Sequence, residues 1–261
     1  MSCPLRRGAT LAALSLSLLL AACGGGTSNK YSGSTLDGQV LMDATAPVTG
    51  SYNVCLYAIA NGQGNPLNTT VSPPANTGTL LTTSCISTDS QGQFSQALPN
   101  FYGPVLVQIT GGSYANRASG TTVSLNAPSA TNAALQAVAF IGGGGTVNVL
   151  VTPLTTIATS MAQAMAGGLS MSNYALAASR VAGEFQLGAT QITSAPNSGD
   201  PQDLVLRGVE QYLVSGQSVV DDPNAANLLT WNTGALGTLS TDYTSAYNTI
   251  NSPTQATFVF Y

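Results

Sequence analysis

The side chains that could carry acid–base chemistry in this sequence are its carboxylates, because the 261-residue chain contains no histidine. Without histidine, the sequence excludes Ser-His-Asp triads, Cys-His pairs and histidine-based zinc sites. The one lysine, Lys30, lies in a Gly- and Ser-rich stretch, which disfavours Ser-Lys hydrolysis and Schiff-base chemistry. Any catalysis would therefore depend on aspartate and glutamate.

The two glutamates, Glu184 and Glu210, lie in segments whose apolar spacing predicts helices. Nearby in sequence are Asp200, Asp203, Asp221 and Asp222. Two carboxylates at a suitable separation can hydrolyse a glycosidic bond, but the spacing selects no pair here. Helix caps and solvated helix faces explain these residues better, and the turn at residues 89–92 lacks the repeated acidic ligands of a calcium loop. We therefore predict no catalytic residue, no metal site and no cofactor.

The four cysteines lie in different sequence contexts. Cys3 belongs to a basic start that contains Arg6 and Arg7, and an apolar run over residues 11–20 leads to small residues before Cys23. This order is typical of a secretory signal peptide, here residues 1–22. The apolar run is shorter than the roughly 20 residues of a permanent transmembrane helix, so we expect it to be removed.

The tetrapeptide over residues 20–23, Leu-Ala-Ala-Cys, resembles the lipobox of bacterial lipoproteins. The resemblance implies that Cys23 is lipidated, becomes the mature N-terminus and anchors the protein to a membrane through acyl chains. Residues 23–35 would then form a lipidated, flexible tether. The residue after Cys23 is Gly24 rather than aspartate, which by resemblance to enterobacterial sorting rules favours the outer membrane. Whether the protein faces the periplasm or the cell surface stays open. The alternative is a secreted protein cleaved near Ala22.

Cys55 and Cys85 remain once Cys3 leaves with the signal peptide and Cys23 is modified. An exported protein meets an oxidising compartment, so we expect these two thiols to form a disulfide. They are 30 residues apart and form no Cys-x-x-Cys motif, which disfavours a redox-active role.

Charged residues make up 6% of the chain, where about 25% is usual for soluble proteins. The basic residues beyond the predicted signal peptide are Lys30, Arg117, Arg180 and Arg207, against ten acidic residues. So little positive charge disfavours an anionic membrane surface as a partner, and we predict no nucleic-acid partner. Solubility must depend on hydroxyl and amide groups, as suits an exported surface protein.

Short β-type runs with regular turn signals fill residues 36–127, and Val105–Ile109 is the clearest buried strand among them. This spacing favours a β-sandwich. Beyond Pro128 the apolar period changes, and helices are expected to begin near Pro153, Ser172 and Pro201. We predict a β-sandwich over residues 36–127 and a mainly α-helical domain over residues 128–261, a mixed α+β chain overall. The glycines at 142–145 are expected to form a hinge before a strand at 146–151.

The β-rich part resembles the carboxypeptidase regulatory-like domain, a transthyretin-like sandwich found in many surface proteins. The resemblance is carried by residues 38–40, 47–50, 54–57, 88–94, 98–99 and 103–105. Such modules usually serve as spacers or binding surfaces, which implies a role without catalysis. Residues 149–156 resemble the start of a helical region that follows such sandwiches in uncharacterised bacterial surface proteins, a match that implies no activity.

Three aromatic residues could contact a sugar ligand: Phe101 and Tyr102 at a Gly/Pro turn, and Tyr114 in a Gly-Gly-Ser-Tyr stretch. The alternative for Phe101 and Tyr102 is packing over the end of the sandwich. The final apolar run, Ala256–Tyr261, is typical of a sheet edge or a self-association segment.

These observations favour a lipid-anchored protein of the bacterial outer membrane that acts as a non-catalytic scaffold or interaction module. One alternative is a carbohydrate-binding surface protein or adhesin. A carboxylate-dependent glycan hydrolase is the less favoured alternative. The expected partners are the membrane, through the lipid anchor, and cell-envelope proteins or glycans.

Overall fold

The computed structural model describes residues 33–59, 67–68, 75–76, 79–125, 134–188, 191–215, 228–229, 231 and 233–261. The predicted signal peptide, the predicted lipidation site Cys23 and most of the predicted tether lie outside these residues, as do Asp221 and Asp222. No helix among the described residues is long and apolar enough to cross a membrane.

Strand β1 (Ser34–Val40) is the centre of a three-stranded sheet. It pairs in parallel with β12 (Gly145–Val151) and antiparallel with β7 (Gln93–Leu98). Side chains alternate along β1, so Leu36 and Val40 are buried while Asp37 and Gln39 face the opposite side. The strand already contains residues 34 and 35, which we had assigned to the tether.

Gly38 makes room in β1 for an aromatic ring of the neighbouring strand. It lies directly opposite Phe94 of β7, and a Cβ atom at Gly38 would be 2.1 Å from Phe94 Cζ. The close approach places the buried Phe94 ring where a side chain would otherwise be.

A second sheet has the strand order β11-β8-β2-β5, with β6 also paired to β2. Its strands are β2 (Gly50–Ala58), β5 (Thr79–Leu80), β6 (Ile86–Thr88), β8 (Gly103–Ile109) and β11 (Gln136–Ile141). β8 is buried along almost its whole length, which confirms the predicted buried strand. Two smaller pairs are β3 (Leu67–Asn68) with β4 (Ala75–Asn76), and β9 (Gly112–Ala115) with β10 (Thr122–Leu125).

The predicted disulfide is present between Cys55 in β2 and Cys85, which precedes β6. The two Cα atoms are 4.4 Å apart. On the chain-entropy model, closing a loop of this length stabilises the fold by roughly 3–4 kcal/mol.

The helices are α1 (Pro153–Ala164), α2 (Met171–Glu184), α3 (Pro201–Ser215) and α5 (Leu236–Ile250), with 3-10 turns η2 (Gln191–Thr193) and η3 (Thr233–Ala235). α1 begins as predicted, with proline first and Thr152 as its cap in a capping box with Thr155. α2 begins earlier than predicted. Its cap is Ser170 rather than Ser172, because the Ser170 hydroxyl is the one that accepts the Asn173 N–H, at 3.1 Å.

The sheets and helices do not separate at the predicted boundary between residues 127 and 128. β11 pairs with β8 and β12 pairs with β1, so strands from beyond that boundary complete both sheets. The glycines before β12 lie in the bend that connects β11 to β12. The chain is therefore α+β in one compact unit over residues 31–261, and strands and helices mix across the expected domain division.

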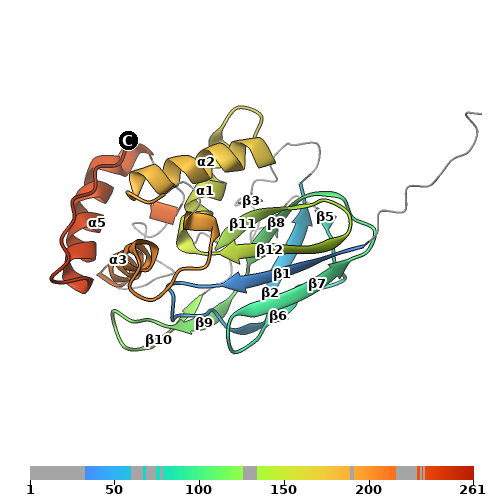
Figure 1. The fold of residues 1–261 in the computed structure, drawn as a ribbon, viewed down its shortest axis with the longest axis horizontal. Helices are drawn as coiled ribbons and strands as arrows, with labels where there is room; N and C mark the ends of the chain where they lie inside the picture. The colour runs from blue at the N-terminus through green and yellow to red at the C-terminus, as the bar shows by residue number, and fades with distance from the viewer. Residues whose placement is uncertain are drawn as a thin grey trace, which may run out of the picture. The chain divides into compact units, whose positions relative to one another are not determined.

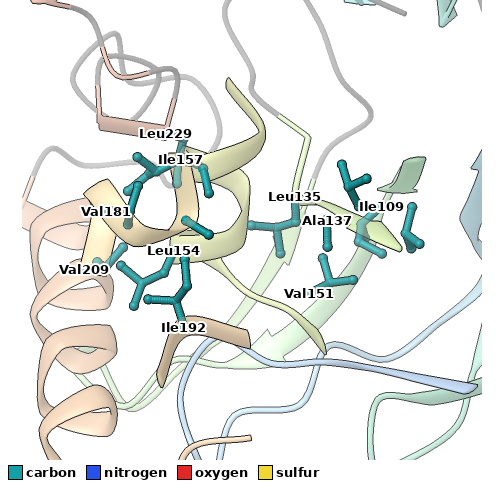
Figure 2. Close-up of a cluster of buried hydrophobic side chains, with 14 of the residues drawn as sticks. Ile109, Leu135, Ala137, Val151, Leu154, Ile157, Val181, Ile192, Val209 and Leu229 are labelled. Carbon is teal, nitrogen blue, oxygen red and sulfur yellow. The ribbon is translucent and has the colours of Figure 1, made fainter. Parts of the chain in front are cut away.

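One hydrophobic core runs through both kinds of element. In Figure 1 the helices gather on one side of the strands. Figure 2 shows the core side chains continuing from the strands to the helices, and labels Ile109, Leu135, Ala137, Val151, Leu154, Ile157, Val181, Ile192, Val209 and Leu229. Continuous burial of this kind fixes the helices against the sheets.

Candidate functional site

An open groove lies over the polar face of the three-stranded sheet. Its volume is about 650 Å³, which is within the range of roughly 300–1,000 Å³ typical of ligand sites. Its lining comes mainly from β1, β7 and β12, and also from the turn before β7 and from the region of η2. The lining residues are Asp37, Gly38, Gln39, Asp89, Gln93, Phe94, Ser95, Asn148, Val149, Leu150, Thr193 and Ala195.

Strand register gathers the polar side chains of the groove into rows across the sheet. Asp37 lies between Asn148 of β12 and Ser95 of β7. In the next row on the same face, Gln39 lies between Leu150 and Gln93. Carboxylate, amide and hydroxyl groups from three strands therefore lie together, beside one apolar side chain.

Hydrogen bonds hold two of these polar groups in place. The Ser95 hydroxyl donates to Asp37 Oδ1 at 2.6 Å, and Gln39 Nε2 donates to the Gln91 carbonyl at 3.1 Å. At the rim, Asp89 Oδ1 accepts the N–H groups of Gln91 and Gln93, each at 2.8 Å. The turn is thus an aspartate-capped turn, as the sequence predicted in preference to a calcium loop.

The groove has no positively charged side chain, since its lining contains two aspartates and no lysine or arginine. Such a lining repels phosphate, sulfate and other anions. Its carboxylates accept hydrogen bonds from hydroxyl groups, while its glutamine and asparagine amides both donate and accept. The groove can therefore bind a neutral molecule that is rich in hydroxyl groups.

A second polar cluster is buried where the β9–β10 turn meets α3. Arg117, in that turn, forms ion pairs with Asp43 (Nε to Oδ2, 3.4 Å) and with Asp203 of α3 (Nη1 to Oδ2, 3.8 Å). Both aspartates have no exposed side-chain surface, whereas the Arg117 side chain is 30% exposed. In Figure 1 the β9–β10 hairpin lies below α3.

Asp203 has the most partners in this buried charge cluster. Arg207, one helical turn further along α3, approaches its Oδ2 to 2.5 Å. The backbone N–H groups of Ala44 and Gly199 donate to Asp203 at 3.1 and 2.7 Å. One carboxylate therefore joins the loop after β1, the loop before α3 and α3 itself.

Glu210 completes the buried charge cluster. Its Oε2 accepts the backbone N–H of Arg117 at 3.0 Å, and its Oε1 has no hydrogen-bond partner among the described residues. Burial, reinforced by the charge of Asp43, raises the pKa of Glu210 to about 8. Glu210 is therefore largely protonated at neutral pH, and the cluster carries less negative charge than its composition suggests.

This cluster lies inside the protein and does not form an accessible acid–base pair. Asp43, Asp203 and Glu210 are all fully buried, and no group of three potential metal-ligating side chains occurs among the described residues. We had expected solvated faces or caps for the acidic residues. That expectation is wrong for Asp203 and Glu210, because α3 turns this face toward Arg117. It is confirmed for Asp200, whose Oδ1 accepts the Asp203 N–H at 2.8 Å where α3 begins.

The other glutamate belongs to a different neighbourhood. Glu184, at the end of α2, pairs with Arg180 at 3.5 Å and accepts the N–H of Tyr261 at 3.0 Å. Glu184 and Glu210 thus have separate partners, and neither lines the groove.

The three predicted sugar contacts do not form one exposed surface. Tyr102 is 49% exposed and packs edge-on against Phe140 of β11, with ring centroids 5.3 Å apart. Phe101 is partly buried against the core. Tyr114 is only 2% exposed and accepts a hydrogen bond from Asn116 Nδ2 at 3.2 Å, so it is an internal residue. Burial also raises the Tyr114 pKa well above its ordinary value.

None of these three aromatic residues lines the groove. The polar groove residues were not singled out from the sequence. The alternation of Asp37 and Gln39 with apolar neighbours was the available signal, but it does not show which strands would lie beside β1.

Comparisons with known proteins provide no family for this chain. No family model matches it, and no curated protein matches it. A crystal structure from Pseudomonas aeruginosa, described as a "putative carbohydrate binding protein", matches 48% of this chain and 92% of its own, at 13% sequence identity and a TM-score of 0.25. A TM-score this low does not establish a shared fold.

Proposed function

We propose that this protein is a lipid-anchored, non-catalytic binding module of the bacterial outer membrane. In this proposal the groove over β12-β1-β7 is its binding surface, and the ligand is a neutral glycan. The observation that carries the proposal is the groove lining: carboxylate, amide and hydroxyl groups in register, without a basic side chain.

The chemistry of the groove favours a glycan over other neutral ligands. A sugar presents adjacent hydroxyl groups, which amide and carboxylate side chains can bind in pairs. Leu150, which lies beside Gln39 on the same face of the sheet, is the apolar side chain of this row and is 7% exposed. The exposed aromatic pair, Tyr102 and Phe140, is a separate surface on which a sugar could stack, and it is the second candidate site.

The sandwich and the family resemblance belong to the same proposal. Both sheets contribute buried side chains to one core, as expected if they form the two layers of a carboxypeptidase regulatory-like β-sandwich. In such a sandwich, β12-β1-β7 turns its polar face outward, where a tethered protein can present it.

Glycan binding is tested with the purified full chain carrying Cys23→Ala, first on an array of neutral and acidic glycans and then by calorimetric titration of the neutral glycan that binds. We expect Asp37→Ala and Asn148→Ala each to weaken binding by roughly tenfold or more, the equivalent of about 1.4 kcal/mol for lost hydrogen bonds. The control is Asp242→Ala, an exposed carboxylate on α5 outside the groove. Equal affinities for all four proteins would refute the groove as the binding site.

Anchoring is tested separately in the bacterial cell. We expect Cys23→Ala to abolish labelling by a fatty-acid analogue and to move the protein from the membrane fraction to the soluble fraction, because the thiol that carries the lipid is gone. Cys3→Ala is the control and should leave labelling intact. Labelling that persists without Cys23 would contradict lipidation at this residue.

A further inference from the structure

The last segment of the chain is bound as an extended peptide. Residues 256–261, called here the tail segment, run beside α5 to the end marked C in Figure 1. Polar side chains one helical turn apart on α5 bond to the backbone of every second tail residue. The bonds are Ala256 N–H to Asn248 Oδ1 (2.8 Å), Phe258 N–H to Thr244 Oγ1 (3.0 Å) and Phe260 N–H to Ser240 Oγ (2.9 Å).

Residues of α2 and of the segment just after it bind the opposite edge of the tail segment. Gln186 Nε2 donates to the Thr257 carbonyl at 2.7 Å. Glu184 Oε2 accepts the Tyr261 N–H at 3.0 Å, and Arg180 donates to the Tyr261 carbonyl. Two helices therefore bind the two edges of one extended strand.

The side chains of the tail segment alternate between a buried and an exposed face. Phe258 and Phe260 are buried against an aromatic cluster, with ring centroids 4.8 Å (Phe258–Tyr243) and 5.0 Å (Phe260–Phe185) apart. On the other face, Val259 is 53% exposed and Tyr261 is 75% exposed. The surface formed by α2 and α5 thus has the two properties of a peptide-binding groove: backbone hydrogen bonds and pockets for alternate side chains.

We propose that this surface is a self-association site, in which the tail segment of a second copy of the chain replaces the resident one. A second copy is the best-matched occupant, because its Phe258 and Phe260 would make all the contacts that the resident segment makes. The connection from α5 runs through residues 252–255, which are all exposed, so it can open without loss of buried surface. Reciprocal exchange gives a closed, two-fold symmetric dimer.

Cysteine trapping tests the exchange, with the full chain carrying Cys3→Ser and Cys23→Ser so that the native disulfide is retained. One chain carries Asn248→Cys and a second carries Ala256→Cys, because these two residues are in hydrogen-bond contact across the groove. The chains are equilibrated together, oxidised and analysed by mass. Thr241→Cys, an exposed α5 position, replaces Asn248→Cys in the control mixture.

We expect a cross-linked species of twice the chain mass in the Asn248→Cys and Ala256→Cys mixture, and its loss in the control mixture. A chain with both substitutions can close within itself when it binds its own tail segment, or onto a second copy when the segments exchange, and so shows that the two cysteines can pair. Internal closure of that chain, together with no cross-link above the control in the mixture, would overturn the proposal.

A second measurement needs no substitution in the groove. Sedimentation equilibrium is measured on the chain that carries only Cys3→Ser and Cys23→Ser. Its apparent mass should rise with protein concentration toward the mass of a dimer. A single-chain mass at every concentration would overturn the proposal.

Discussion

At the residue scale, Arg117 lies in a loop but connects segments that are far apart in the chain. Its guanidinium pairs with Asp43 and Asp203, and its N–H donates to Glu210. The sequence showed Arg117 as one of few basic residues but gave no sign that three carboxylates surround it. Those partners come from distant segments, and only the packing of α3 on the β9–β10 hairpin brings them together.

The raised pKa of Glu210 predicts a pH-dependent stability. The folded state holds the Glu210 proton up to about pH 8, whereas the unfolded state releases it near the ordinary value of 4.5. Between these values the folded state binds more protons, so the contribution of Glu210 to the free energy of unfolding falls as pH rises. The limiting slope is roughly 1.4 kcal/mol per pH unit.

We expect Glu210→Gln to remove this component, because an amide keeps an acceptor for the Arg117 N–H and has no proton to lose. Urea unfolding at about pH 5 and about pH 8 should show a smaller loss of stability in this variant than in the native protein. Asp242→Asn, an exposed change, is the control. Identical pH dependence in Glu210→Gln and the native protein would show that Glu210 does not titrate in this way.

At the element scale, local sequence signals predicted where an element begins better than they predicted which other elements it pairs with. Thr152 and Pro153 predicted the start of α1, because capping and a fixed proline φ are properties of a few adjacent residues. The predicted mainly helical domain over residues 128–261 includes residues 136–141 and the strand predicted at 146–151. They belong to the sheets, because β1 and β8 supply their hydrogen-bond partners from far earlier in the chain.

Packing of β1 on β7 predicts a specific cost at Gly38. We expect Gly38→Ala to lower the free energy of unfolding by roughly 1–3 kcal/mol, because its Cβ would overlap the Phe94 ring. Phe94→Leu removes that ring, so the double variant should be more stable than the sum of the two single changes predicts. Urea unfolding of the four proteins measures the coupling. Strict additivity would mean that the ring does not determine the need for glycine.

At the scale of the whole molecule, the few charges are distributed unevenly. Arg117, Asp43, Asp203 and Glu210 are gathered in the buried charge cluster, while the groove displays two carboxylates among neutral amides and hydroxyls. The low charge content of the sequence predicted a surface of hydroxyl and amide groups. It could not predict the groove, because the groove depends on the parallel pairing of β1 with β12 and on its neighbour η2.

The predicted ligand contacts illustrate the same limit. Tyr102 is exposed, but Tyr114 is internal, and the sequence context of an aromatic residue does not determine which face of a strand it occupies. The disulfide could be predicted because elimination left one possible partner for Cys55, and the structure confirms it.

The most direct test of the central claim is to map the bound glycan on the isotope-labelled full chain carrying Cys23→Ala, by following amide and side-chain NMR signals during titration. If the glycan binds in the groove, signals of Gln39, Ser95 and Asn148 shift in proportion to occupancy, while those of Tyr102 and Phe140 stay in place. Shifts confined to Tyr102 and Phe140, or no saturable shift in the groove with any glycan, would contradict binding in the groove.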